Sequence, residues 1–193
     1  MDDENTMKVI FVGSSGVGKT SLLNYFRGEN LSTVSTVSPE NYTKTVINSR
    51  NIKVKLDLWD TAGQEEYQAI MPMYYRGANV AIVCANKENL NTLTEWIDKV
   101  IEISPECTIF LTVTKSDLLS SNEIEEATKF VDNLTSNEGL AENYFVTSAI
   151  TGDGVENLFG EIADCNIKVS AKGKSIQIQS NGPTQNEKKG CCN

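Results

Sequence analysis

A chain of 193 residues with 39% hydrophobic and 22% charged side chains has the composition of one soluble globular domain and is long enough to bury a sizeable core. No apolar run approaches the roughly 20 residues of a membrane-spanning helix, and the acidic N-terminus is unlike a secretory signal, so we expect a cytosolic protein. The net charge of −9 argues against nucleic acid as a partner, and without histidine any catalysis must rely on other groups.

The first predicted element is a short apolar strand at 7–12, which stops at Gly13. After it, Leu22, Leu23 and Phe26 recur at the spacing of a helix face. A strand therefore leads into a glycine-rich loop and then into a helix.

The next part of the chain combines a loop with a hairpin. Residues 29–41 are rich in serine, threonine and asparagine and contain Pro39, a composition typical of loops. Two strand-like segments, 42–48 and 52–59, stand on either side of the turn 48–51. They predict an antiparallel hairpin.

Three further strands are predicted in the second half of the chain, at 80–84, 108–113 and 144–146. The segments between them have helical periodicity. Strands that alternate with helices predict an α/β fold, in which a mostly parallel sheet is covered on both faces.

Two of the predicted helices have a clear apolar face. The first places Leu93, Trp96, Ile97, Val100 and Ile101 on a single face. The second begins near Asp153, which is placed to form a capping box with Glu156. Its buried stripe is Leu158, Phe159 and Ile162.

Beyond about Val169 the composition changes to serine, glutamine, asparagine, glycine and lysine, with too little apolar content to offset the entropy of ordering. We predict a flexible N-terminus at 1–6, one domain at 7–168 and a flexible tail at 169–193. The end of the chain has an excess of lysine, which suits an anionic surface.

The five cysteines fall into two groups. Cys84, Cys107 and Cys165 lie in apolar stretches without metal-ligand spacing, so we interpret them as core residues in a reduced compartment. Cys191 and Cys192 stand next to the end of the polar tail and need a separate explanation.

The segment Gly13-x4-Gly18-Lys19-Thr20 matches the Walker A pattern, with the preceding strand and following helix that this pattern requires. Glycines let backbone N–H groups approach phosphates closely, Lys19 reaches the β and γ phosphates, and the Thr20 hydroxyl binds Mg²⁺. The alternative is a tight glycine turn with a surface lysine. With this loop, the predicted fold is the three-layer sandwich of a P-loop NTPase, a mostly parallel six-stranded sheet with one antiparallel hairpin strand.

Two further motifs follow predicted strands. Asp60-Thr61-Ala62-Gly63-Gln64 supplies a carboxylate linked to Mg²⁺ through water, the Gly63 N–H for the γ-phosphate and Gln64 to orient water. In Thr114-Lys115-Ser116-Asp117, the Asp117 carboxylate is suited to accept two hydrogen bonds from the N1–H and 2-amino group of guanine. Adenine lacks these donors and would leave the charge unpaired.

From about Met7 to Cys165 the chain resembles the Ras superfamily of small GTPases. The three motifs above and Thr147-Ser148-Ala149 occur in the order of that superfamily. The resemblance implies a GTPase that is slow without an activating protein. It also implies that Lys115 flanks the base and the phosphate loop, that Ser148 and Ala149 line the base, and that Ser21 contacts the α-phosphate.

The predicted site has three parts. The nucleotide-binding residues are Ser15, Gly16, Val17, Gly18, Lys19, Thr20, Ser21, Gly63, Thr114, Lys115, Asp117, Ser148 and Ala149. The catalytic residues are Gln64 and Lys19, and the Mg²⁺ ligands are Thr20, Thr36 and Asp60.

Within the superfamily the Rab branch is most similar, through the segments 59–65 and 73–78. That branch regulates vesicle traffic, and the second segment most resembles endosomal Rabs. Rab proteins commonly carry geranylgeranyl groups on paired C-terminal cysteines, which implies lipidation of Cys191 and Cys192. Two lipid chains beside lysines make a stable anchor, whereas exposed thiols on a loose end are the alternative.

The resemblance implies a switch that recruits effectors in its GTP form to the cytoplasmic face of intracellular membranes, endosomes favoured, and that cycles with the cytosol. Its implied partners are an exchange factor, a GTPase-activating protein, effectors, a GDP-dissociation inhibitor and the Rab prenylation machinery. We expect a monomer. A nucleotide-bound scaffold with negligible turnover and an ATP-dependent P-loop kinase are the alternatives.

The chain departs from the family pattern at several positions. Thr114 stands where asparagine is usual, although guanine selectivity is expected to persist, and Ile150 stands where a lysine is usual, which predicts a less tightly held base. The first switch loop is irregular. Thr36, before Val37, Ser38 and Pro39, is its best candidate Mg²⁺ and γ-phosphate ligand, and Thr33 is a weaker one.

Overall fold

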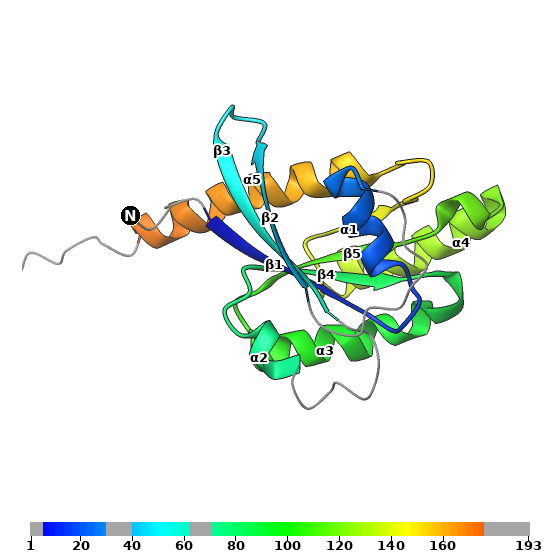
Figure 1. The fold of residues 1–193 in the computed structure, drawn as a ribbon. Helices are drawn as coiled ribbons and strands as arrows, with labels where there is room; N and C mark the ends of the chain where they lie inside the picture. The colour runs from blue at the N-terminus through cyan, green and yellow to red at the C-terminus, as the bar shows by residue number, and fades with distance from the viewer. Residues whose placement is uncertain (1–5, 30–39, 62–70, 176–193) are drawn as a thin grey trace, which may run out of the picture.

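The structure, a computed structural model, describes residues 6–29, 40–61 and 71–175. Its described part contains a six-stranded sheet with helices on both faces (Figure 1), and the strand order is β2-β3-β1-β4-β5-β6. β2 and β3 are antiparallel and every other neighbouring pair is parallel, which confirms the predicted α/β sandwich with one antiparallel hairpin strand. The strands are β1 Thr6–Val12, β2 Glu40–Ile47, β3 Lys53–Asp60, β4 Val80–Ala85, β5 Thr108–Val113 and β6 Asn143–Val146.

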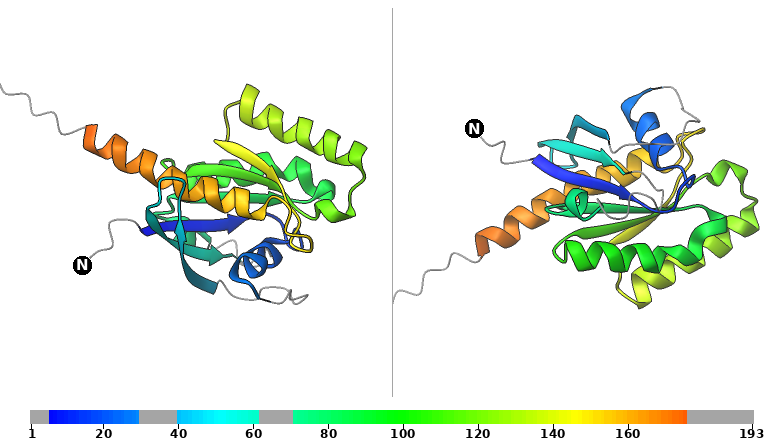
Figure 2. Two further views of the ribbon diagram at one scale, coloured as in Figure 1. Left: turned by 90° about the horizontal axis from the view of Figure 1, so that it is seen from above. Right: turned by 60° about the horizontal axis from the view of Figure 1, so that its bottom comes forward.

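The helices form a layer on each face of the sheet (Figure 2). α1, Lys19–Arg27, and α5, Val155–Ser175, cover one face. α2, Met71–Tyr75, α3, Leu93–Ile103, and α4, Ser121–Asp132, cover the other. Short 3₁₀ turns, η2 at Lys87–Thr92 and η3 at Ser116–Leu118, precede α3 and α4, and the π turn η4, Asn133–Asn137, follows α4. No helix in the described residues is long and apolar enough to span a bilayer.

The central strand β1 is buried on both faces. Val9 and Phe11 pack with α1 and α5, whereas Ile10 and Val12 pack with α3 and α4, as the alternation of a strand requires. On the first face the Phe159 ring of α5 stacks on the Phe26 ring of α1, with centroids 3.5 Å apart. The two helical layers therefore fix the end of β1, where the phosphate loop begins.

Two predicted features of the helices differ in detail in the structure. Ile101 is 42% exposed, whereas Leu93 and Val100 are fully buried. At about 100° per residue, Ile101 lies about 80° from Leu93 and falls outside the buried stripe of α3. The predicted capping box also does not form, because Asp153 lies one residue too early to cap α5 and accepts a hydrogen bond from the Thr151 hydroxyl instead.

The ends and the cysteines can be compared with the sequence as well. α5 extends to Ser175, past the predicted domain end at residue 168. Cys84 and Cys165 are buried, as predicted for core residues, and Cys107 is partly buried.

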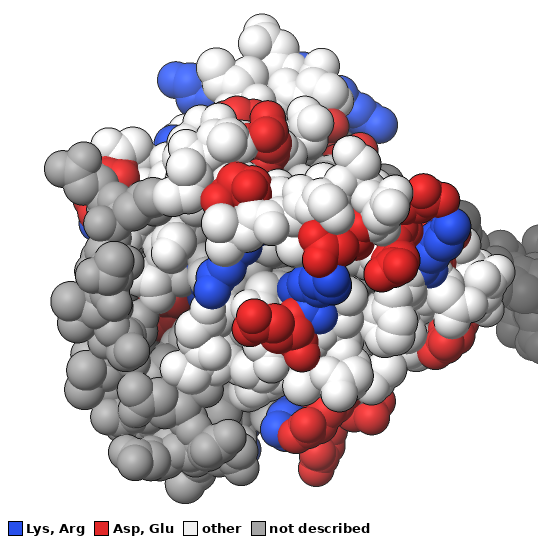
Figure 3. All heavy atoms as spheres, turned by 90° about the vertical axis from the view of Figure 1, so that its right-hand side faces the viewer, with Lys and Arg blue, Asp and Glu red and all other residues white. Residues whose placement is uncertain are grey.

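On the face that carries α4, acidic side chains cover more of the surface than basic ones, and the two signs lie side by side (Figure 3).

Candidate functional site

The loop from Gly13 to Gly18 joins β1 to α1 and presses against the end of β4. Gly13 has φ +137°, and a Cβ atom there would lie 2.2 Å from the carbonyl oxygen of Cys84. Gly18, with φ 106°, is the residue before α1, so the free N–H groups of the first helical turn face the loop. Glycine is therefore required at Gly13 by close approach and at Gly18 by backbone conformation.

Lys19 is the buried cation of this loop. Its ammonium donates hydrogen bonds to the carbonyl oxygens of Gly13, at 2.8 Å, and Ser14, at 2.9 Å. Burial lowers the pKa of Lys19 from its ordinary value because it disfavours the charged form, and the carboxylate of Asp60 opposes that shift. A cation in a cavity of backbone groups is the arrangement that receives phosphate.

Thr20 and Asp60 come together although they belong to different elements. The Thr20 hydroxyl, on α1, donates to Asp60 Oδ2 at 2.6 Å, and Asp60 is buried at the end of β3. A hydroxyl and a carboxylate are hard oxygen ligands, the kind that Mg²⁺ prefers. This pair therefore fits the predicted metal site.

Thr114 connects the loop to two strands. Its hydroxyl lies within hydrogen-bonding distance of the carbonyl oxygens of Val17, in the loop, and Ala85, at the end of β4. The Ala85 oxygen also accepts from the Thr114 N–H at 2.8 Å. Thr114 thus ties the phosphate loop to the ends of β4 and β5.

Asp117 is oriented by the loop that follows β6. Ser148, which is fully buried, donates its hydroxyl proton to Asp117 Oδ1 at 2.5 Å. The Ser148 oxygen accepts in turn from the N–H groups of Ile150 and Thr151, both at 3.1 Å. The carboxylate of Asp117 is exposed, so it is held in place and still accessible to a ligand.

A pocket of about 280 Å³ lies between these groups. It is lined by Gly18, Ser21, Leu22, Thr114, Lys115, Asp117, Leu118, Thr147, Ala149 and Ile150. Lys115 has the left-handed conformation that is uncommon outside glycine, with φ 59°. Leu118 and Ile150 are exposed apolar side chains at this pocket. An apolar cavity with one fixed carboxylate at its wall is suited to a planar base with donor groups on one edge.

The match to known proteins extends over most of the chain. A model of the Ras family matches residues 8–168. The chain is 34% identical over 197 residues to the Ras-related protein Rab-24 of Dictyostelium discoideum, covering 96% of each chain. It is 36% identical over 164 residues to Rab-4 of the same organism, covering 79% of this chain and 75% of the relative. With Rab-18-B of Danio rerio the identity is 31% over 211 residues, covering 100% and 97%.

The chain belongs to the Ras family and is a Rab-type small GTPase. As a member of this family it is a small GTP-hydrolysing enzyme, and the family binds guanine nucleotide and, in general, Mg²⁺. Of the predicted nucleotide-binding residues of this GTPase, Gly18, Ser21, Thr114, Lys115, Asp117 and Ala149 line the pocket beside the phosphate loop. Within that loop, Ser15 and Gly16 are exposed and Val17 is buried.

Several predicted residues of this GTPase lie outside the described part of the chain. They are Thr33, Thr36, Gly63, Gln64, Cys191 and Cys192. Their roles in the first switch loop, in hydrolysis and in lipidation stay predictions.

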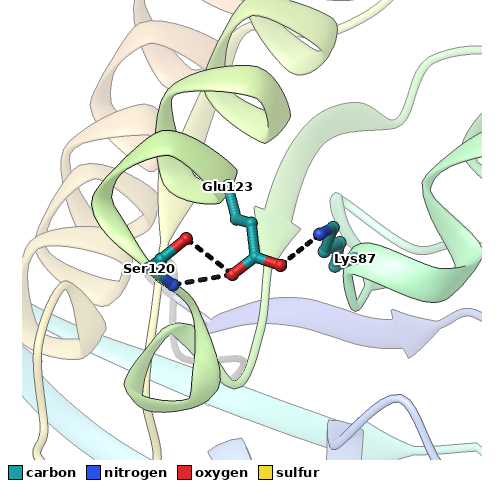
Figure 4. Close-up of polar contacts among 3 residues, drawn as sticks. All are labelled: Lys87, Ser120 and Glu123. Carbon is teal, nitrogen blue, oxygen red and sulfur yellow. Dashed lines mark hydrogen bonds and ion pairs between the residues drawn. The ribbon is translucent and has the colours of Figure 1, made fainter.

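Sequence reasoning missed a polar cluster that joins the start of α4 to η2 in this GTPase (Figure 4). Glu123, in the first turn of α4, accepts from the N–H and the hydroxyl of Ser120, both at 2.8 Å, and forms an ion pair with Lys87 of η2. The hydrogen bond from Lys87 and the two from Ser120 lower the pKa of Glu123 to about 2. The spacing Ser120-x-x-Glu123 is a capping-box signal that the sequence carries, whereas the Lys87 contact needs the fold.

Proposed function

We propose that this small GTPase binds GDP and GTP at the described pocket, hydrolyses GTP, and in the GTP form recruits effectors that act in vesicle traffic. The observation that carries the proposal is that one pocket is lined both by Asp117 and by Gly18 and Ser21, which flank Lys19 and Thr20. Thr114 joins its phosphate and base halves through Val17.

Each half of the site has a defined chemistry. Asp117, held by Ser148, accepts from the two donors on the guanine edge, and adenine would leave that carboxylate unpaired. Lys19 and the N–H groups of the loop stabilise the negative charge of the phosphates. When bound, Mg²⁺ neutralises part of that charge, and Thr20 and Asp60 are the described residues that would hold it. Gln64 orients the attacking water.

Base selectivity is tested by displacing a fluorescent GDP analogue with unlabelled GTP or ATP. We expect GTP to compete at least 100-fold better than ATP, because the edge of adenine leaves the Asp117 carboxylate unpaired. Sites that hydrogen-bond a substrate group discriminate against analogues without it by roughly 10⁴-fold. Asp117→Ala should remove most of that preference. Asp153→Ala, another exposed aspartate that accepts from a neighbouring hydroxyl, is the matched control. Equal competition by ATP would refute the guanine site.

Hydrolysis is tested by single-turnover phosphate release from the purified protein. Gln64→Leu should slow release, because leucine cannot orient water. A wild-type protein that holds GTP and releases no phosphate, even with an activating protein, would be a nucleotide-bound scaffold instead. Undiminished release by the Gln64→Leu variant would exclude the role given to Gln64.

Membrane attachment is proposed to depend on geranylgeranyl groups at Cys191 and Cys192, with intracellular, and specifically endosomal, membranes as the site of action. The similarity to Rab-24, Rab-4 and Rab-18-B supports action on intracellular membranes in general. The double substitution Cys191→Ser and Cys192→Ser should move the protein to the soluble fraction of cells. Unchanged membrane partitioning of that variant would refute the anchor.

A further inference from the structure

We propose that Trp96 of α3 is a positioning residue for the phosphate loop, which it holds through the side chain of Ser14, and that this contact slows nucleotide release. The inference rests on the proposed nucleotide site. It assigns to α3, an element that lines no part of the described pocket, control over how firmly the phosphates are held.

The contact consists of a directed chain of polar groups. The indole N–H of Trp96 donates to Ser14 Oγ at 3.3 Å, and Ser14 Oγ lies 3.5 Å from Thr92 Oγ1. The Thr92 hydroxyl gives its only proton to the carbonyl oxygen of Asn89, at 2.8 Å. Ser14 is therefore the donor toward Thr92, and Trp96 is the donor toward Ser14.

Ser14 also belongs to the phosphate side of the site. Its carbonyl oxygen accepts from the Lys19 ammonium at 2.9 Å, while its side chain accepts from Trp96. The glycines Gly13 and Gly16 of the same loop have positive φ angles and no side chain to anchor them. Ser14 is thus a point at which a side chain can fix this part of the loop to the rest of the molecule.

Trp96 is a firm support for such a contact. It is 7% exposed and packs in the core shared by α3, α4 and the sheet, and Lys99 covers its ring at 4.4 Å from the centroid. A large, closely packed ring loses little freedom when its N–H makes a hydrogen bond. Ser14 is joined to this support across 82 positions of sequence.

The first test is a double-mutant cycle read out as the dissociation rate of a fluorescent GDP analogue. Ser14→Ala and Trp96→Phe each remove one end of the hydrogen bond, and each should raise the rate about five-fold, the effect of one typical hydrogen bond. The double variant should release GDP no faster than the faster single variant, because both remove the same contact. Multiplied effects, or unchanged rates in both single variants, would overturn the proposal.

The second test uses the fluorescence of Trp96 and does not depend on Trp96→Phe folding. The chain has 2 tryptophans, so Trp59→Phe leaves Trp96 as the only one. Trp59 donates to Asp57 and not to the loop, so this variant is also the control for loss of an indole and should keep the wild-type GDP rate. When a chelator removes Mg²⁺ and the nucleotide dissociates, the emission of Trp96 should shift.

In the double variant Trp59→Phe with Ser14→Ala, that shift in Trp96 emission should disappear. A shift of the same size in both variants would mean that Trp96 senses the nucleotide without Ser14, which overturns the proposal. Failure of the proposed function is distinguishable, because a wild-type protein that binds no GDP analogue would give no rate at all.

Discussion

Replacing Thr114 by valine removes one hydroxyl from the junction between the phosphate loop and β5 and nearly keeps the shape of the side chain. The Ala85 oxygen retains its bond from the Thr114 N–H at 2.8 Å, so the loss falls on the carbonyl oxygen of Val17. The side chain is buried, and a buried acceptor without its donor costs about 1–3 kcal/mol. If that cost falls on the nucleotide-bound form, GDP dissociation rises about 5- to 150-fold.

The assay is the dissociation rate of a fluorescent GDP analogue, with thermal unfolding of the same samples. Thr114→Ser is the matched control, because it keeps the hydroxyl and loses only a methyl group. We expect Thr114→Ser to remain within about three-fold of wild type while Thr114→Val exceeds it clearly. The melting temperature of Thr114→Val should fall by roughly 2–12 °C. Equal GDP rates for the valine and serine variants would refute the reasoning.

Three other changes have expected outcomes. Gly13→Ala places a Cβ atom 2.2 Å from the Cys84 oxygen and should weaken GDP binding more than ten-fold in titrations. The control Gly160→Ala, whose Cβ atom meets no atom within 4 Å, should keep the wild-type affinity, and equal affinities of the two variants would contradict the reasoning. Phe159→Ala should cost about 3–5 kcal/mol in urea unfolding, and a loss below 1 kcal/mol would be inconsistent with its stacked ring. Because the folded pKa of Glu123, about 2, lies below the ordinary 4.5, its contribution to stability is complete above pH 4.5 and is lost as pH falls toward 2. In acid unfolding curves Glu123→Gln should lack that dependence, and an unchanged curve would contradict it.

The parts of the fold that the sequence predicted are those with a local signal. Thr108–Val113 is a continuous apolar run between polar segments, and it is β5 in the structure. The hairpin turn is equally local, because Asn48 accepts from the N–H groups of Arg50 and Ile52, both at 3.0 Å. Such contacts depend on neighbours in sequence and can be read without the fold.

The incorrect predictions have a different origin. Ile101 matches the apolar pattern of α3. It lies at the edge of the apolar face, however, and the sheet does not cover it, so its side chain stays exposed. Asp153 satisfied a capping pattern, but the start of α5 at Val155 was set by the turn through Gly154, which has φ +70° and packs against Val146. A pattern allows an element to form, and the surrounding packing determines its exact boundary.

Within the site, the sequence predicted the candidate binding residues but not the contacts that support them. The Walker A pattern identified Lys19, the motif after the predicted strand 108–113 identified Asp117, and the family resemblance identified Ser148. The bond from Thr114 to Val17 spans 97 positions, and the bond from Trp96 to Ser14 spans 82. No pattern of local spacing encodes such pairs, because they exist only after β4, β5 and α3 have packed.

These supports bear on the departures from the family pattern. Isoleucine at position 150, where a lysine is usual, predicts a less tightly held base. The structure places several supports on the phosphate half instead: Asp60 holds Thr20, Thr114 holds Val17 and Trp96 holds Ser14. If those contacts carry the affinity, Ile150→Lys will change GDP release less than Thr114→Val does. The reverse order would mean that the base half controls exchange in this GTPase.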